Sequence, residues 1–411
     1  MIRVAFLPLY TEAWDSLAEV YERMRKDERF EVRVFTIKRK LTGDSDFHGQ
    51  QEAHDYLASK KVDNTMLSSV EALKEFAPDY TFINYPWQRN YEEQYRAEQL
   101  VKFTKIAYVP YFLLPMVTEP WDVGVAGHYY RQRSHQLASL IFTQDRNTKR
   151  AFELTQRGGK YVKFTGSPKI DSMLKRARKV KKVARSRYRI IWAPHHSYGP
   201  LWLNFGTFAQ MHNEMLEFAR SHQDVDIVFK PHPFLLGTMT DRGLMTQQQV
   251  DEWEAAWNSL PNTTTNTDSD YVNLFVNSDM LLCDGISFLG EYPLITGRPA
   301  VFIEREDHWA FSPLGETIAK TTVRFNSFAA FVAQFEKLRS EGLPDRTEQI
   351  ENFMDEAIPF PRKAARKIIK AVIKDFAKHK PLVDASKVTE TTWEQEADAR
   401  RAAGAALAQP Q

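Results

Sequence analysis

Histidines follow two short apolar runs of this chain, at the points where the runs meet proline. His195 and His196 come after the run 188–193, and His232 comes after the run 226–229. Proline cannot donate to a β-ladder, so each run predicts a buried strand that ends at the proline. Parallel strands end at the sheet edge where open α/β sheets bind ligands. We therefore expect the three histidines at one such edge.

A third apolar run, 280–283, predicts another strand of the same sheet, followed by a turn and a helix. The turn begins with Asp284 and Gly285, which permits a sharp bend, and Ser287 is expected to cap the helix. The free N–H groups of such a helix start bind phosphate or pyrophosphate, and Glu291, one turn later, can accept hydrogen bonds from ribose hydroxyls. The alternative is an ordinary capped helix in which Glu291 complements the helix dipole.

Three histidines fit a zinc site, acid–base catalysis or plain packing. The adjacent His195 and His196 are expected to point in different directions, and no acidic fourth ligand is spaced with them, so the sequence predicts no metal site. Imidazole titrates near neutral pH, which favours a general base or a donor to phosphate. The prolines on either side of His232 fix its backbone, which favours a functional role over packing.

Strands and helices alternate along both halves of the chain. The strand-like runs of the first half are 2–9, 30–37, 79–84, 104–109, 140–142 and 161–164, and the alternation restarts at 188 and continues to 303. Such alternation predicts doubly wound parallel sheets. The first strand is not followed by a Gly-x-Gly-x-x-Gly loop, so the dinucleotide fingerprint is lacking.

The expected fold class is therefore α/β and GT-B-like, with two doubly wound parallel-sheet domains facing a cleft and helices at the carboxyl end. We expect an acceptor-side domain over residues 1–180 and a nucleotide-donor domain over 188–345. Terminal helices should follow over 346–380, broken by two prolines, and a disordered tail over 381–411.

The stretch 169–189 is strongly basic, because ten of its 21 residues are Lys or Arg. One interpretation is a solvated helix and linker between the domains. The other is a docking surface for an anionic membrane, to which each basic residue contributes about 1 kcal/mol. No nucleic-acid partner is expected, since no recognition motif accompanies the charge.

The composition is that of a soluble globular protein, with 43% hydrophobic residues and a net charge of +2. The single cysteine excludes a disulfide framework. The first residues lack the apolar run of a signal peptide, and no run reaches the roughly 18 residues of a membrane span. We expect a cytoplasmic protein, with a peripheral position at the inner face of the membrane as the variant that the basic stretch would support.

Three motifs at the predicted edge resemble the CDP-glycerol glycerophosphotransferase family, the polymerases and primases of teichoic acid and capsule. They are Trp-Ala-Pro-His-His at 192–196, Phe-Lys-Pro-His-Pro at 229–233 and Cys-Asp-Gly-Ile-Ser-Phe-Leu-Gly-Glu-Tyr at 283–292, and the resemblance extends over about 1–340. It implies a GT-B fold, a CDP-glycerol or similar CDP-alditol donor, and a polyol-phosphate or saccharide acceptor. It implies no required cofactor and leaves the need for a divalent metal open.

The resemblance also implies a mechanism. An acceptor hydroxyl would attack the β-phosphorus of the donor in line and release CMP, which needs a base near the nucleophile and donors around the phosphate. His196 or His195 is the implied base, and His232 and Lys230 would contact phosphate oxygens. Donor-binding roles are implied for the turn that carries Asp284, Gly285, Ser287 and Glu291. Many family members have Asp-Tyr-Ser-Ser at 284–287, so here the phosphate contact depends on Ser287 and the backbone.

Two other functions fit the same sequence. A nucleotide-sugar glycosyltransferase or a related epimerase would keep the fold and the donor site but change the chemistry. A non-catalytic GT-B module would serve as a scaffold in envelope assembly, although the three histidines together with Ser287 and Glu291 argue against that.

Overall fold

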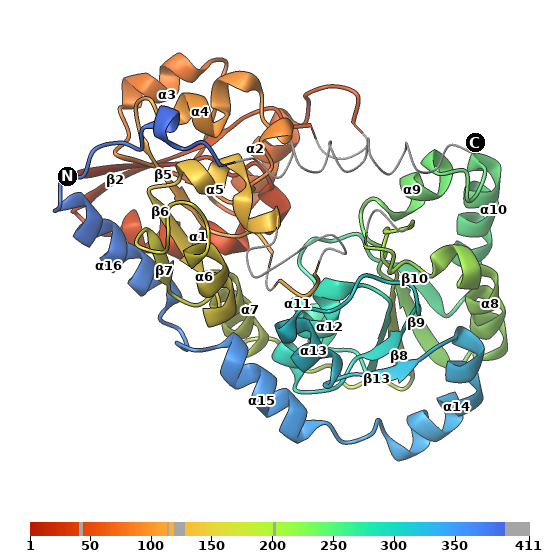
Figure 1. Cartoon of the computed structure of the whole chain (residues 1–411). Helices are drawn as coiled ribbons and strands as arrows, with labels where there is room; N and C mark the ends of the chain where they lie inside the picture. Colours follow the sequence, from red (N-terminus) through yellow and green to blue (C-terminus); the bar gives the residue numbers. More distant parts are fainter. Residues whose placement is uncertain (41–43, 113–114, 119–127, 200–202, 391–411) are drawn as a thin grey trace, which may run out of the picture. The chain divides into compact units, whose positions relative to one another are not determined.

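The computed structural model describes residues 1–40, 44–112, 115–118, 128–199 and 203–390. The chain forms two compact units, and each is described by itself (Figure 1). The first domain consists of Met1–Leu113, Trp121–Ser172 and Ala357–Gln411. The second domain consists of Leu114–Pro120 and Met173–Glu356.

The first domain contains a parallel sheet that has seven strands within the described residues, in the order β3-β2-β1-β4-β5-β6-β7. The strands are β1 (Ile2–Phe6), β2 (Phe30–Thr36), β3 (Thr65–Met66), β4 (Tyr80–Ile83), β5 (Lys105–Tyr108), β6 (Leu140–Thr143) and β7 (Val162–Phe164). The helices are α1 (Asp15–Met24), α2 (Gln50–Ser59), α3 (Val70–Phe76), α4 (Ala97–Leu100), α5 (Arg133–Leu137), α6 (Arg146–Glu153) and α16 (Ala364–Phe376). The boundary between the two domains falls within α7 (Pro168–Ala177).

The second domain repeats this plan with a parallel sheet that has six strands in its described part, in the order β10-β9-β8-β11-β12-β13. The strands are β8 (Tyr188–Ala193), β9 (Val225–Phe229), β10 (Thr263–Thr265), β11 (Met280–Cys283), β12 (Val301–Ile303) and β13 (Val323–Phe325). The helices are α8 (Phe208–Ser221), α9 (Leu235–Asp241), α10 (Gln247–Asn258), α11 (Val272–Val276), α12 (Ile286–Thr296), α13 (Pro313–Ala319), α14 (Phe328–Glu341) and α15 (Thr347–Ala357). Two doubly wound parallel-sheet domains confirm the predicted fold class.

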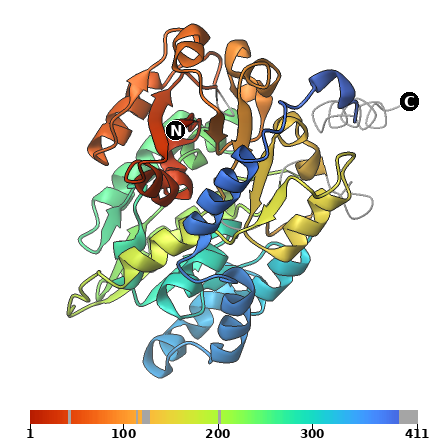
Figure 2. The same cartoon turned by 90° about the vertical axis from the view of Figure 1, so that its left-hand side faces the viewer.

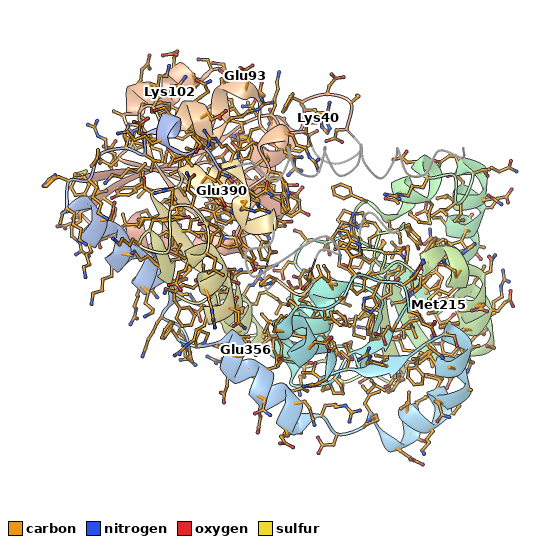
Figure 3. The ribbon with its side chains drawn as sticks, in the orientation of Figure 1. Lys40, Glu93, Lys102, Met215, Glu356 and Glu390 are labelled. Carbon is orange, nitrogen blue, oxygen red and sulfur yellow. The ribbon has the colours of Figure 1, made fainter. Side chains whose placement is uncertain are left out.

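Packed aromatic rings stabilise the second sheet and so fix the positions of the loops that follow its strands. The Trp192 ring lies 4.9 Å from Phe229, 5.5 Å from Phe208 and 5.6 Å from Trp257, and all four rings are buried. Side chains fill the space between α8 and this sheet, where Met215 is buried (Figure 3). Large buried rings contribute most of the burial energy in a core, so the strand ends that follow them are held in place.

Helix α16 returns the end of the chain to the first domain, where it lies beside α1 on the outside of the sheet (Figure 2). A buried polar cluster fixes it: the Asp375 carboxylate accepts a hydrogen bond from the Tyr80 hydroxyl at 2.7 Å and pairs with the Lys105 ammonium at 3.0 Å. Helix α15 instead belongs to the second domain, so the expected group of terminal helices is divided between the two units.

Two other segments differ from expectation. Residues 115–118 come from the first half but belong to the second domain, where Val117 pairs with Phe311 and Ser312 donates to the Met116 carbonyl at 2.8 Å. The tail expected to be disordered from 381 is ordered up to 390, because Val388 is buried and Arg133 donates to its carbonyl at 2.8 Å. Figure 3 labels Glu390 at the end of this segment. The rest of the predicted tail lies outside the described residues.

Among the helices of the described ranges, none combines the length and the apolar character needed to cross a bilayer.

Candidate functional site

The strand register explains why the predicted residues meet in the second domain. Trp192 of β8 is paired with Phe229 of β9 on one side and with Leu282 of β11 on the other. Three residues beyond this row come His195, His232 and Gly285. The strand order reverses between β8 and β11, which is the position where doubly wound sheets form their ligand crevice.

The three histidine rings pack against one another in a cluster, which we call the histidine edge. The ring centroids of His196 and His232 are 3.8 Å apart and stacked, and His195 lies 4.6 Å from His196 and 5.1 Å from His232. One ring nitrogen of each lies within 4.8 Å of the others. The expectation that the adjacent pair points in different directions was therefore wrong, because the backbone after Pro194 turns both rings towards His232.

Backbone amides determine the tautomers of two of these rings. The Nδ1 of His195 accepts hydrogen bonds from the backbone N–H of Ser197 at 3.2 Å and from its hydroxyl at 2.8 Å. The Nδ1 of His232 accepts one from the backbone N–H of Phe234 at 3.2 Å. A neutral imidazole that accepts at Nδ1 carries its proton on Nε2. Each of these rings therefore presents an N–H donor.

This pattern does not suit a metal ion. A histidine that binds a metal through one nitrogen usually donates a hydrogen bond from the other. In His195 and His232, Nδ1 receives donors and Nε2 holds the proton, so neither nitrogen has a lone pair to offer. The arrangement instead suits an anion that accepts hydrogen bonds, such as a phosphate.

Burial keeps the histidine edge neutral. It lowers the pKa of His196 to about 4, and the nearby Arg242 guanidinium acts in the same direction. The pKa values of His195 and His232 lie well below 6.5, first because the rings are desolvated and then because they are close to another histidine. Near pH 7 the three rings are therefore neutral, and they can form hydrogen bonds without bringing a charge.

Asp284 organises the loop that carries two of the histidines. One carboxylate oxygen accepts from the backbone N–H of His195 at 2.6 Å, and the other accepts from the N–H of Thr207 at 2.6 Å and its hydroxyl at 2.7 Å. The side chain is buried, and desolvation raises its pKa to about 7. The residue predicted to contact the donor thus uses both oxygens within the protein.

The turn after β11 differs from its prediction in two ways. Gly285 has an extended backbone, with φ of −111°, and its conformation does not require glycine. A Cβ there would lie 2.7 Å from the Cβ of His195, so the small residue is needed for close approach. Gly285 is also the N-cap of α12, so Ser287 was wrongly predicted as the cap. It lies exposed in the first turn of the helix.

Glu291 and Lys230 are both buried in the second domain. Glu291 accepts a hydrogen bond from the Tyr271 hydroxyl. The Lys230 ammonium donates to the carbonyl of Asp268 at 2.8 Å, which ties the loop after β10 to β9. Burial lowers the pKa of Lys230. Their predicted roles at ribose hydroxyls and phosphate remain predictions.

Sequence reasoning missed Arg242, the residue that follows α9. Its guanidinium donates to the Tyr198 carbonyl, and its charge contributes to the lowered pKa of His196. A ligand anion near His196 would therefore also be close to a cation. A single exposed arginine after a short helix carries no sequence signal that singles it out.

The carboxyl edge of the first sheet carries aromatic rings instead, which we call the aromatic edge. Tyr10, Tyr85 and Tyr111 lie with their ring centroids 5.1–5.9 Å apart, and Trp87 lies 5.0 Å from Tyr85. All four are partly exposed. Asn84 fixes Tyr10 by donating to its carbonyl at 3.0 Å. The aromatic residues are scattered through the sequence, so only the fold reveals their grouping.

At least four of the ten basic residues in the stretch 169–189 form ion pairs with carboxylates of the second domain. Arg176 pairs with Asp270 at 3.0 Å, Arg185 with Asp279 at 2.6 Å, and both Arg187 and Arg189 with Asp226. This pairing supports the interpretation of the stretch as helix α7 followed by a linker.

No protein-family model matches the chain, and no curated protein matches it by sequence. Solved structures match its fold. The UDP-GlcNAc 2-epimerase of Neisseria meningitidis, bound to UDP-GlcNAc, is 13% identical with a TM-score of 0.59, and the match covers 92% of this chain and 100% of that one. The S. aureus MnaA–UDP structure gives the same identity and TM-score, with 92% and 97% covered. The wall teichoic acid polymerase TagF is 13% identical with a TM-score of 0.50, and 92% of this chain and 89% of TagF are covered.

The fold is GT-B-like. The matching structures are those of enzymes, an epimerase and a polymerase among them, but identities this low establish the architecture alone.

Proposed function

We propose that the histidine edge binds the diphosphate of a nucleotide-linked sugar and that the protein is an enzyme that acts on such a substrate. The observation that carries this proposal is the pair of amide-bound Nδ1 atoms, which gives His195 and His232 an N–H donor each. The start of α12, with the exposed Ser287, adds backbone donors beside them. The similar structures bound to UDP-GlcNAc and UDP support a nucleotide-linked substrate.

His196 is the proposed general base. His195 and His232 cannot accept a proton at Nε2 while Nδ1 accepts an amide, so they are better suited to hold phosphate oxygens. At pH 7 His196 is neutral and carries a lone pair on one ring nitrogen, because its pKa is about 4 in the unliganded protein. A bound diphosphate would raise this pKa and make the ring a stronger base when substrate is present.

The site supports a glycosyltransferase or an epimerase of nucleotide-linked sugars. Both reactions need the nucleotide held firmly while chemistry takes place at the sugar. We propose that the aromatic edge binds a sugar ring or a saccharide acceptor, because tyrosine and tryptophan faces pack on the C–H groups of sugars while their polar tips form hydrogen bonds.

A CDP-alditol phosphotransferase is the second candidate. The motifs at 192–196, 229–233 and 283–292 favour it, and so does the structural match with TagF. In this reaction an acceptor hydroxyl loses its proton to His196 and attacks the β-phosphorus, and CMP leaves as the bond to the bridging oxygen breaks.

A substrate panel distinguishes the candidates. The full chain is incubated with UDP-GlcNAc, other UDP-sugars and CDP-glycerol, and the products are followed by phosphorus NMR and chromatography. Release of UDP or formation of an epimer supports the first proposal, and release of CMP from CDP-glycerol supports the second. Calorimetric titration with UDP and CDP provides a test without turnover, in which a His232→Ala variant should lose affinity while a His212→Ala control should keep it. Failure of both nucleotides to bind wild-type protein would remove the site from the histidine edge.

A further inference from the structure

The outer face of α16 carries a group of cations that form no ion pair with the residues that the structure describes. Arg366, Lys370 and Lys374 follow one another at four-residue spacing along α16, and Arg362 and Lys378 lie in the turns just before and just after the helix. All five side chains are exposed. We call this group the basic stripe. Figure 2 shows α16 along the outside of the first domain.

The carboxylates near the stripe already have partners, and Asp171 of α7, at the start of α16, accepts from the backbone N–H groups of Arg362 and Ala364. Asp375 is the one acidic residue of α16, and it is turned inwards to Tyr80 and Lys105. On the neighbouring α1, Glu19 pairs with Arg23 at 2.7 Å and Glu22 pairs with Arg25 at 2.8 Å. The pKa of Lys163 is lowered, first by burial and then by the charges of Lys374, Lys378 and Lys380. Like charges at four-residue spacing destabilise a helix, so this pattern has a cost to the fold.

We propose that the basic stripe docks the first domain on an anionic lipid bilayer. A helix of 13 residues is about 20 Å long, and an extended planar surface can contact its exposed face along that length. Each basic residue that reaches an anionic membrane adds attraction, and the stripe brings together three such residues on α16 and one in each flanking turn.

Other partners fit this surface less well. Protein interfaces are depleted of lysine and need an apolar centre, whereas the apolar residues of α16, among them Ile368, Ile369 and Val372, are buried against the first domain. A single-stranded nucleic acid needs stacking rings within a basic groove, and the stripe is a ridge. This surface is also distinct from the stretch 169–189, in which Arg176, Arg185, Arg187 and Arg189 are paired with carboxylates.

The test is co-sedimentation of the full chain with vesicles of phosphatidylcholine alone or with about 30% phosphatidylglycerol. Wild-type protein should bind the anionic vesicles at about 50 mM salt and dissociate from them at about 500 mM, because salt screens exposed charges. The variant combining Arg366→Gln, Lys370→Gln, Lys374→Gln and Lys378→Gln should bind about tenfold more weakly or worse.

A matched control removes the same four charges elsewhere. It combines Arg178→Gln, Lys179→Gln, Lys181→Gln and Lys182→Gln, all exposed residues of the linker. This control should bind within about twofold of wild type. Both variants should keep the melting temperature of the wild type, because the eight side chains are exposed. The proposal is overturned if wild-type protein does not bind anionic vesicles at low salt, or if the control loses as much binding as the stripe variant. Preferential binding of RNA to the stripe over the vesicles would also overturn it.

Discussion

The two carboxyl edges of this molecule have the same construction but carry different chemistry. In the first sheet Phe82 of β4 is paired with Phe6, and Asn84 follows two residues later to hold the loop after β1 through Tyr10. In the second sheet Leu282 of β11 occupies the corresponding place, and Asp284 follows two residues later to hold the loop after β8 through His195. The first loop is held by the neutral side-chain amide of Asn84, and the second loop is held by the buried carboxyl of Asp284.

The side chains that these two loops carry also differ. Asn84 supports a group of aromatic rings, and Asp284 supports three neutral histidines. The architecture therefore determines where a ligand can sit, whereas the side chains three to five residues beyond the paired strands determine what it can be. The aromatic edge offers stacking surface, and the histidine edge offers proton donors and acceptors.

The largest expected difference between the edges is catalytic. With a confirmed substrate, His196→Ala should lower kcat by about 10²–10⁴-fold while substrate affinity stays near wild type, because a general base acts mainly in the transition state. His232→Ala should lose both kcat and affinity, since its N–H is proposed to hold phosphate in the ground state. Steady-state kinetics and calorimetry measure the two effects. Near-wild-type turnover in both variants would contradict the proposed roles.

The pH dependence of stability should have opposite signs for His196 and for Asp284. The folded pKa of His196, about 4, lies below its ordinary 6.5, so the unfolded chain binds the proton first and stability is lost as the pH falls from 6.5 towards 4. The loss for this group is about 3 kcal/mol. Asp284 has the opposite sign: its folded pKa of about 7 lies above 3.8, so protonation favours the folded state as the pH falls through this range.

Denaturant unfolding of variants across pH 4–8 measures these contributions. His196→Asn should flatten the loss of stability in acid, and Asp284→Asn should steepen it. The same direction of change in both variants would show that the assigned signs are wrong.

Asp284 and Asn84 should respond differently when the side chain of each is replaced by that of the other. Asp284→Asn replaces one acceptor oxygen with an NH₂ group that faces donors of His195 or Thr207, which costs about 1–3 kcal/mol. Hydrogen exchange should then show these two amides exchanging roughly 5–150-fold faster. The control is Asn84→Asp, which should speed exchange near Tyr10 and leave the second domain unchanged. Equal protection in wild type and Asp284→Asn would remove the carboxylate from this role.

The smallest expected effect belongs to the aromatic edge. Tyr85→Ala should raise KM for a saccharide substrate about 2–10-fold with little change in kcat, because an aromatic contact contributes roughly 0.5–1.5 kcal/mol. Tyr85→Phe separates the ring from its hydroxyl. Burial raises the pKa of Tyr85 to about 12, so its phenol stays neutral and these variants should keep the wild-type pH profile below about pH 10. A large loss of kcat in Tyr85→Ala would mean that the first edge takes part in the chemistry.

Most of the fold and the location of the histidine edge could be predicted from local sequence. The apolar runs before Pro194 and Pro231 define strands whose ends must meet, because parallel strands in one sheet share an edge. What the sequence could not show depends on contacts between distant residues. The use of both Asp284 oxygens and the reason for Gly285 each require the positions of neighbouring loops. The ion pairs of the basic stretch are likewise formed with carboxylates 37 to 94 residues away.

The position of α16 has a consequence for how the protein is made. Met173–Glu356 is inserted between two parts of the first domain, so a ribosome completes most of the second domain before α16 leaves the exit tunnel. Until then the apolar side chains that Ile368 and Val372 will cover in the first domain lack that cover, and the carboxylate partner of Lys105 has not yet emerged. The domain whose synthesis begins first is therefore the last to finish folding. During that interval its exposed sheet is the part of the nascent chain on which chaperones would act.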